Sequence, residues 1–261
     1  MSYFGDVQLA HSSALGELVL AHHRPSSCLD PHQHEASYVS LCLDGSYLED
    51  VGGLVEEVTR GDVFVHPVGE AHANDMASRG ATILNLRVSA PIQRLYNASQ
   101  VHGTRAKLTC SGEFVRQIET IFSGNLECEW LYQLLGTADI ILPLLVPGGG
   151  VGRGEDRLDK VIAAIEMNLD QSWSLSDLAS IAGYHPVYFG QKFKERFGYP
   201  PGDHVRRMRM RAALRLMCLE GLTATESAHL VGFFDSAHMA HTFRKALGVS
   251  PSSFRKAALS S

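Results

Sequence analysis

Ser174–Gly198 reads SLSDLASIAGYHPVYFGQKFKERFG, and Thr223–Gly248 reads TATESAHLVGFFDSAHMAHTFRKALG. Each copy begins with a hydroxyl residue followed three positions later by an acid, which is the capping-box pattern of a helix start. An alanine and, four residues later, a glycine then predict a close helix crossing and a tight turn. An amphipathic helix follows in both copies. The repeat therefore predicts two tandem helix-turn-helix units, an arrangement suited to reading DNA major grooves.

The second helix of each copy separates into two faces at about 100° per residue. One face holds the apolar residues that would anchor each helix: Phe189, Phe193 and Phe197, then Met239, Phe243 and Leu247. The opposite face, with its edge, holds Val187, Gly190, Gln191 and Lys194, then Ala237, Ala240, His241 and Arg244. Each outward face ends in a cation suited to phosphate or guanine.

Residues 201–219 connect the copies and read as one helix with an apolar seam at Val205, Met208, Ala212 and Leu216. A continuous helix would act as a spacer that holds the two readers about 34 Å apart, one turn of DNA. Arginines decorate the rest of this helix. We expect some of them to contact phosphates, namely Arg206, Arg207 and Arg209.

The formal net charge of −5 hides an asymmetry between the two parts of the chain. Residues 1–150 hold 8 Lys/Arg and 17 Asp/Glu, whereas residues 151–261 hold 15 and 11. A basic back half suggests contact with a polyanion, and a solvated charged surface would give the same count. The chain shows no membrane-length apolar run, no secretory signal and no paired cysteine motif, which predicts a cytoplasmic protein with reduced thiols.

Residues 1 to about 105 predict a β-rich domain, because short strand-like runs alternate with turn signals. The runs are Leu15–His22, Tyr38–Leu43, Gly53–Val58, Val63–His66 and Thr82–Val88, and the turn signals include Asp44-Gly45 and Arg60-Gly61-Asp62. Regular short strands of this kind are typical of a sandwich or barrel.

Two histidine-bearing motifs lie within these strands. The first is His32-Gln-His34 followed by Tyr38, and the second is Gly61-DVFVH-Pro67-V-Gly69-EA-His72. Residues two apart in a strand share a face, so the three histidines could meet at one barrel mouth. Three interpretations stay open: an effector pocket that includes Tyr38, a divalent metal site on His32, His34 and His72, or a structural role.

These two motifs resemble those of the cupin family, a small jelly-roll barrel. In metal-binding cupins the first motif supplies two histidines and a glutamate, and the second supplies a third histidine. Here the glutamate position falls near Tyr38 or Val39, so one ligand is missing. The resemblance implies a jelly-roll barrel, and the missing carboxylate favours a polar pocket without metal or other cofactor.

Ser111 to about Val146 has a helical pattern, with apolar residues at three- and four-residue spacing on both sides of Gly124-Asn125. This helical pair would pack on the barrel or mediate self-association. Pro147-GGGVGRGE-155 is rich in glycine and predicts a linker. We therefore expect a sensor or dimerisation domain at 1–146, a linker at 147–157 and a helical domain at 158–256, with helix-turn-helix units at about 175–197 and 224–247.

Residues from about Leu158 to Lys256 resemble the DNA-binding domain of AraC/XylS-type transcriptional regulators. The matching segments include Leu175–Ala179, Gly183-Tyr184, Phe193-Lys194, Arg209-x3-Ala213, Gly232-Phe233, Asp235–Gly248 and Val249–Arg255. The resemblance implies a seven-helix domain for sequence-specific DNA binding, usually for activation, joined to a cupin-like domain that senses a small molecule or dimerises.

The same resemblance implies base-facing roles for specific positions. They are Val187, Gly190, Gln191 and Lys194 in the first reader, and Ser236, Ala237, Ala240, His241 and Arg244 in the second. Family members more often carry larger polar side chains at three of these positions, where Gly190, Ala237 and Ala240 offer backbone or methyl contacts alone. Base discrimination would then depend heavily on Gln191 and His241.

The first hypothesis is a multidomain β + α protein, not an enzyme, that regulates transcription in response to a small-molecule effector. Its partners would be double-stranded DNA, a second copy of itself and RNA polymerase, with no membrane. The alternative is a cupin metalloenzyme with an accessory DNA-binding domain, which needs a full ligand set for the metal. A constitutive DNA-binding structural protein would leave the histidine-bearing barrel without a role.

Overall fold

The computed structural model describes residues 5–96, 105–122, 130–145 and 157–259. Contacts divide the chain into two compact units, Met1–Ser89 with Ser99–Ile140, and Ala90–Ala98 with Ile141–Ser261. The first unit is built on strands and the second on helices, as expected for a β + α protein. The predicted linker at 147–157 falls outside the described residues except for its last position, so the predicted domain boundaries stay a prediction.

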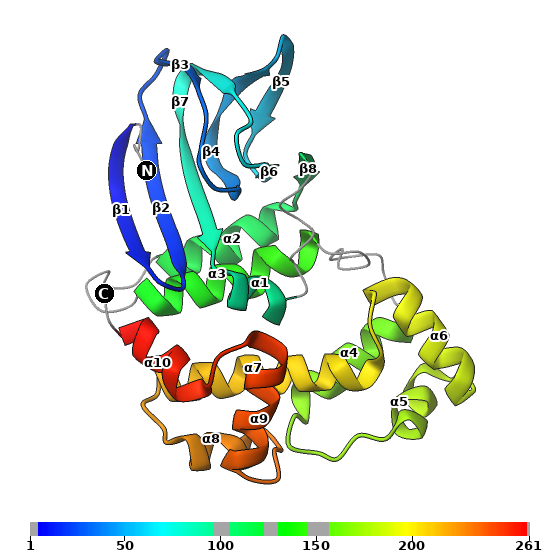
Figure 1. Cartoon of the computed structure of the whole chain (residues 1–261). Coiled ribbons are helices and arrows are strands. Elements are labelled where there is room, and N and C mark those ends of the chain that lie inside the picture. The colour runs from blue at the N-terminus through cyan, green and yellow to red at the C-terminus, as the bar shows by residue number, and fades with distance from the viewer. Residues whose placement is uncertain (1–4, 97–104, 123–129, 146–156, 260–261) are drawn as a thin grey trace. The chain divides into compact units, whose positions relative to one another are not determined.

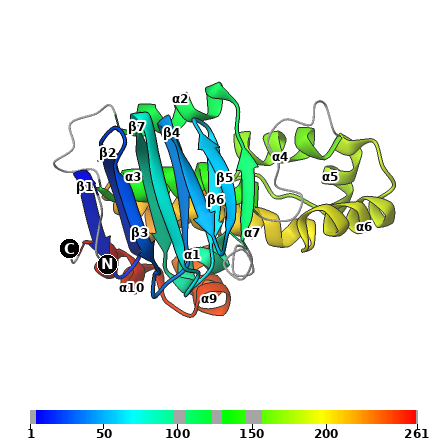
Figure 2. The same ribbon diagram turned by 90° about the horizontal axis from the view of Figure 1, so that it is seen from above.

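The first unit is an eight-stranded antiparallel sheet in the order β1-β2-β7-β4-β6-β8, with β3 paired to β7 and β5 to β4 (Figures 1 and 2). Its strands are β1 (Asp6–Ser13), β2 (Gly16–His23), β3 (Cys28–His32), β4 (Tyr38–Val51), β5 (Leu54–Thr59), β6 (Asp62–His66), β7 (His72–Val88) and β8 (Ala106–Thr109). Strands β1, β3 and β8 were not among the predicted runs. Their outward-facing residues are largely polar, so the apolar pattern is weak.

The two long strands differ most from the predicted short runs. Asp44-Gly45, read from sequence as a turn, is instead an irregularity inside β4, where the register against β7 shifts. Gly45 has φ +75°, and a Cβ there would lie 2.0 Å from the carbonyl oxygen of Gly80. The glycine is therefore required because two backbones cross closely, and the strand continues through it.

Two helices complete the first unit, α2 (Gly112–Phe122) and most of α3 (Trp130–Leu145). They confirm the predicted helical pair. Phe114 and Ile118 are buried, and a Cβ on Gly136 of α3 would lie 3.1 Å from the Ile121 side chain of α2. The apolar side chains of Trp130 and Leu131, which belong to the same sequence pattern, lie outside the described side chains.

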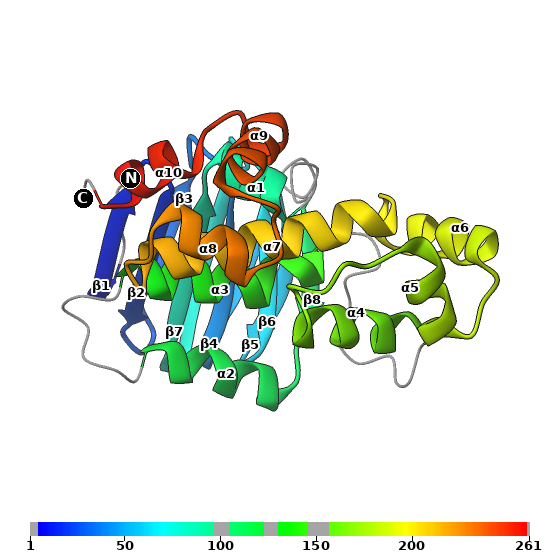
Figure 3. The ribbon, with the colours of Figure 1, turned by 90° about the horizontal axis from the view of Figure 1, so that it is seen from below.

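The second unit holds the seven helices expected for residues 158–256: α4 (Arg157–Met167), α5 (Leu175–Ala182), α6 (Pro186–Phe197), α7 (Pro201–Cys218), α8 (Ala224–Leu230), α9 (Ser236–Leu247) and α10 (Pro251–Leu259). Figure 3 shows α7 running from the α4–α6 group to α8 and α9. The short helix α1 (Ala90–Leu95), which was not predicted, also belongs to this unit. None of the helices in the described ranges is both long and apolar enough to cross a membrane.

His204 lies within the core at the start of α7. Its Nδ1 is 3.0 Å from the Tyr199 hydroxyl, and its ring meets the rings of Phe193 and Phe197 at 5.5 and 5.6 Å. Burial, and then the charges of Arg211 and Arg207, lower the pKa of His204 to about 3. The neutral imidazole is therefore part of the packed state at neutral pH.

Protonation of His204 should destabilise the helical unit in acid. The unfolded histidine takes up its proton near pH 6.5 and the folded one near pH 3, so its contribution to stability is complete above pH 6.5 and is lost as the pH falls toward 3. When the pH falls from 7.5 to 5.0, the wild type should lose at most about 2 kcal/mol more unfolding free energy than His204→Gln, which has no imidazole to protonate. Urea unfolding at the two pH values measures this difference, and parallel pH profiles would contradict it.

Candidate nucleic-acid interface and sheet pocket

Helices α5 and α6 form the first helix-turn-helix unit. The Ser174 hydroxyl accepts a hydrogen bond from the Asp177 N–H at 3.1 Å, and the Asp177 carboxylate accepts from the Ser174 N–H at 2.9 Å. Gly183 ends α5 with φ +64°, and Pro186 begins α6. The capping box, the turn glycine and the helix-initiating proline are all as predicted.

The outward face of α6 is the predicted one. Val187 is 62% exposed, and Gln191 and Lys194 are exposed, whereas the three phenylalanines of the opposite face are buried. Gly190 lies half-buried at the edge, where a Cβ would meet the Leu175 side chain at 4.0 Å. The next lysine, Lys192, bonds Glu195 at 2.9 Å and so differs from Lys194 in its surroundings.

Helices α8 and α9 repeat this arrangement. Thr223 and Glu226 form the second capping box, and Asp235 begins α9 by accepting a hydrogen bond from the His238 N–H at 2.6 Å. Ala237, His241 and Arg244 are exposed on one side of α9, while Ser236 and Ala240 are half-buried. The buried side holds Met239, Phe243 and Leu247, as predicted, together with Thr242.

The arginines of α7 do not share one role. Arg209 donates three hydrogen bonds to main-chain carbonyls, from Nε to Leu169 at 2.8 Å, from Nη1 to Gly232 at 2.7 Å and from Nη2 to Gln171 at 2.7 Å. The expected phosphate contact by Arg209 is therefore corrected, because its guanidinium is committed to bracing the fold.

The other two arginines also have intramolecular partners. Arg207 donates to the carbonyls of Arg94 and Leu95 and lies over the Tyr199 ring at 5.0 Å. Arg206 forms an exposed ion pair with Asp203 one helical turn away. Because an exposed pair opens at little cost, Arg206 fits a phosphate contact better than Arg207 does.

Gly232 is the second element of this brace. It has φ +81°, and a Cβ there would lie 2.8 Å from Arg209 Nη2 and from the backbone of Asp170. The turn of the second unit therefore packs directly on the segment that precedes the first unit. Arg209 and Gly232 together join the two helix-turn-helix units, a function that residue spacing along the chain did not indicate.

An open cavity lies in the first unit, lined by residues of β2, β3, β4, β6 and β7 and by His34. Val19, Ala21, Leu29 and Ile83 contribute apolar surface, and the ion pair of Glu17 with Arg87 lies among the lining residues. The remaining lining residues are His23, His32, His34, Tyr38, Ser40, Tyr47, Glu49, His66, His72, Asn74 and Asn85. A mixed lining of this kind suits a small organic ligand with polar groups.

The structure brings the four residues of the predicted effector pocket together. The rings of His32 and His72 are 4.4 Å apart, those of His34 and Tyr38 are 4.6 Å apart, and the Tyr38 hydroxyl is 3.2 Å from His72 Nε2. Burial lowers the pKa of His34 and lowers that of His72 to about 4. Both imidazoles are therefore neutral at pH 7 and available as hydrogen-bond partners or ligands.

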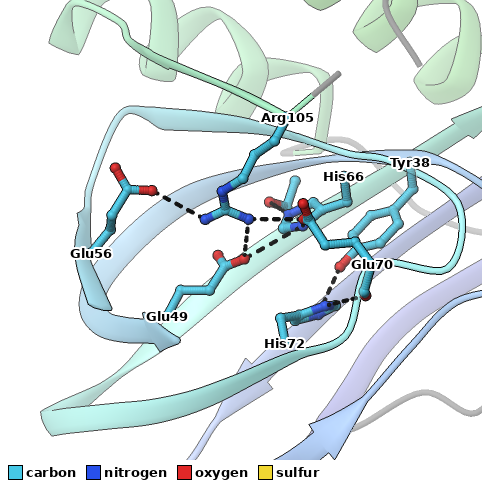
Figure 4. A network of polar contacts seen from close by, with 8 residues as sticks. Tyr38, Glu49, Glu56, His66, Glu70, His72 and Arg105 are labelled. Carbon is cyan, nitrogen blue, oxygen red and sulfur yellow. Dashed lines mark hydrogen bonds and ion pairs between the residues drawn. The ribbon is translucent and has the colours of Figure 1, made fainter. Parts of the chain in front are cut away.

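A polar network beside the histidines was missed from sequence (Figure 4). Arg105 contacts the carboxylates of Glu49, Glu70 and Glu56 at 2.9, 3.0 and 3.2 Å. Burial raises the pKa of Glu49, which is fully buried, while Arg105 opposes that shift. His66 lies within the second histidine-bearing motif, and its ring centroid is 4.3 Å from that of Tyr38. The contact between Glu49 and Arg105 could not be predicted, because the two residues are far apart in the sequence.

Two groups within the described residues have metal-ligand chemistry, and they differ in fit. In His32, His34 and His72 the candidate ligand atoms lie within 4.8 Å of one another. Nδ1 of His32 and Nδ1 of His72 meet the carbonyls of Asp30 and Glu70 at 2.8 and 3.2 Å, the partners that orient metal-bound histidines. In the second group, Glu49, His66 and Glu70, the two carboxylates are instead paired with the Arg105 guanidinium, and His66 Nδ1 lies 3.5 Å from Glu49. The three histidines thus fit a divalent metal, with Tyr38 standing where the sequence predicted a missing glutamate.

Comparison with known proteins finds relatives over the helical unit and, among them, two that match over nearly the whole chain. A helix-turn-helix domain model matches residues 178–257. The transcriptional activator AarP of Providencia stuartii is 30% identical over 98 residues, which cover 38% of this chain and 73% of AarP. The transcriptional activator RhaR of Cronobacter sakazakii is 25% identical over 258 residues, 92% of this chain and 91% of RhaR.

A putative AraC-like transcription regulator of Streptomyces lividans is 25% identical over 114 residues, 44% of this chain and 38% of that protein. With several other relatives the aligned segment spans about a third of the relative's length. All of these relatives are named as transcriptional regulators or activators.

Removing the Arg209 brace should destabilise the helical unit. Arg209→Met leaves three carbonyls without their donor, and we expect a loss of about 3 kcal/mol in unfolding free energy. Arg209→Lys should recover only part of the loss, because an ammonium cannot reach three acceptors as a guanidinium fork does. Urea unfolding measures both, with Arg206→Met as the matched control. An Arg209→Met effect no larger than that of the control would contradict the bracing role.

Proposed function

The chain belongs to the AraC family of transcriptional regulators, and we propose that it binds double-stranded DNA by placing α6 and α9 in successive major grooves. The observation that carries the proposal is the pair of matching outward faces, each with an exposed cation and an exposed second hydrogen-bonding side chain. Gln191 and Lys194 serve in the first reader, and His241 and Arg244 in the second. Val187, Gly190, Ser236, Ala237 and Ala240 complete the surface next to the bases.

The helical unit supports this proposal through its dimensions. An 18-residue helix is roughly 27 Å long, so α7 is a spacer of the same order as one turn of DNA, about 34 Å. The Arg209 brace limits rotation of one unit against the other. The N-terminal ends of α6 and α9 carry the positive pole of each helix, and Arg206 adds an exposed cation on α7 for a phosphate.

We also propose that the sheet pocket receives a small-molecule effector. Apolar surface from Ile83 and Val19 would hold the body of the ligand, and His32, His34, Tyr38 and His72 would recognise a polar group on it. Neutral imidazoles make hydrogen bonds without the cost of removing a charge from water. A divalent metal on the three histidines is a second candidate ligand, favoured by the carbonyl-anchored geometry of His32 and His72.

The partners implied by the family complete the proposal. A regulator of this kind works in the cytoplasm, where the chromosome is, and AarP and RhaR are named as activators. We infer that this chain likewise activates transcription by contact with RNA polymerase, as a homodimer and without enzymatic activity.

Neutralising the outward cations should weaken DNA binding. Lys194→Ala and Arg244→Ala should each lower the affinity for DNA. Each should also reduce the slope of log K against log salt concentration by about the contribution of one phosphate contact. Gln191→Ala should instead relax base preference with little change in slope. Lys192→Ala is the matched control, since Lys192 pairs with Glu195. The assay is fluorescence anisotropy with duplexes that the full chain selects from a random pool, and equal slopes for all variants would refute these reader assignments.

Ligand binding to the pocket should raise the thermal stability of the full chain. A ligand at 100 times its Kd stabilises by about 2.7 kcal/mol, which a thermal-shift screen of metabolites and divalent metals detects. Ile83→Phe narrows the pocket and should abolish the response to an organic ligand, whereas His34→Ala should abolish the response to a metal. A response that survives both substitutions would place the ligand elsewhere.

A further inference from the structure

Phe234 is the most exposed large hydrophobic side chain in the ranges that the structure describes, with 84% of its surface accessible. It lies in the turn between α8 and α9, directly before Asp235, which caps α9. Single exposed apolar side chains are common on protein surfaces, so the exposure of Phe234 is informative only together with its place beside α9.

A role in capping α9 does not explain Phe234. A hydrophobic residue before an N-cap often packs on the fourth residue of the helix, here Met239. Met239 is fully buried and Phe234 is not, so the pair does not form such a staple. The preceding residue, Phe233, supplies the anchor instead: it is 4% exposed and its ring meets His238 at 5.5 Å.

Phe234 has no equivalent in the first helix-turn-helix unit, because the turn of the second unit is one residue longer. The N–H of Tyr184 bonds the Ala179 carbonyl at 2.9 Å, and the N–H of Phe233 bonds the Ala228 carbonyl at 2.9 Å, so these two residues are equivalent. In the first unit the next residue, His185, is already the N-cap of α6. In the second unit Phe234 stands between the equivalent residue and the N-cap.

The surroundings of Phe234 indicate what it contacts. It lies at the end of α9 that, in helix-turn-helix proteins, reaches the base edges first. The first turn of α9 holds Ser236, Ala237 and His238, of which Ala237 offers a methyl group on the exposed side, and His241 and Arg244 follow one and two turns later. Phe234 and Ala237 therefore add apolar surface beside the polar groups at the start of this reader. The base feature that suits an apolar contact in the major groove is the C5-methyl group of thymine.

We propose that Phe234 is a specificity-determining residue that contacts a thymine methyl group at the N-terminal end of α9. The proposal rests on the proposed function, because it requires α9 to enter the major groove. The first reader has an exposed apolar residue of its own in Val187, 62% exposed at the second position of α6, where α9 has Ala237. The two readers would then differ in reach, with the aromatic ring of the second extending further along the groove.

The test begins with duplex DNA that the wild-type full chain selects from a random pool at a fixed salt concentration. Phe234→Ala should bind the selected duplex about tenfold more weakly, and Phe234→Leu should lose less because it keeps an apolar contact. Met167→Ala, at an 82% exposed position on α4, is the matched control and should leave affinity unchanged. The unfolding free energies of all three variants should match that of the wild type.

Replacing single selected thymines by deoxyuridine removes one methyl group and separates a base contact from any structural effect. At one position the replacement should weaken wild-type binding about fourfold. The same replacement should cost Phe234→Ala nothing further, since the contact is already lost. If every replacement affects the two proteins equally, or if Phe234→Ala binds as tightly as the wild type, the proposal is overturned while the proposed function stands. If the wild type selects no duplex, the proposed function itself fails.

Discussion

The guanidinium of Arg209 joins parts of the helical unit that are far apart in the chain. Its three hydrogen bonds reach two carbonyls before the first helix-turn-helix unit and one in the turn of the second. Each unit has its own apolar core, so without this brace the units would share little more than the helix α7. Gly232 adds to the constraint, because its left-handed backbone lets the turn approach Asp170 closely. Two readers that must meet one duplex depend on this shared frame.

Burial sets the charge state of the sheet pocket. His34, His66 and His72 remain neutral because the removal of water lowers their pKa, and the buried carboxylate of Glu49 is paired with Arg105. The result is a cavity with apolar walls and a group of uncharged ring nitrogens beside a paired cation. Such a lining favours recognition through hydrogen bonds or metal ligation over attraction of an oppositely charged ligand.

The two helix-turn-helix units share the same backbone framework but expose different side chains. Both begin with a capping box, turn at a glycine and bury an apolar stripe at the same positions. Their outward faces differ, with an amide and an ammonium on α6, and an imidazole and a guanidinium on α9. The extra Phe234 in the second turn increases this difference. A duplex read by both helices would therefore be asymmetric.

Local sequence determined the helical unit to a large extent. Capping boxes, turn glycines and apolar spacing act within one or two helical turns, so Ser174, Gly183 and the Phe189 stripe could be read from neighbouring residues. The two-residue spacing of His32 and His34 could be read in the same way, whereas His72 joins them through the pairing of β3 with β7. Tertiary structure decided what depends on distant residues: the continuation of β4 through Gly45, the pairing of Glu49 with Arg105 and the bracing by Arg209. In the sequence alone, an arginine on a helix is indistinguishable from a surface cation. The carbonyls that Arg209 contacts are distant in the chain, so residue spacing does not predict these contacts.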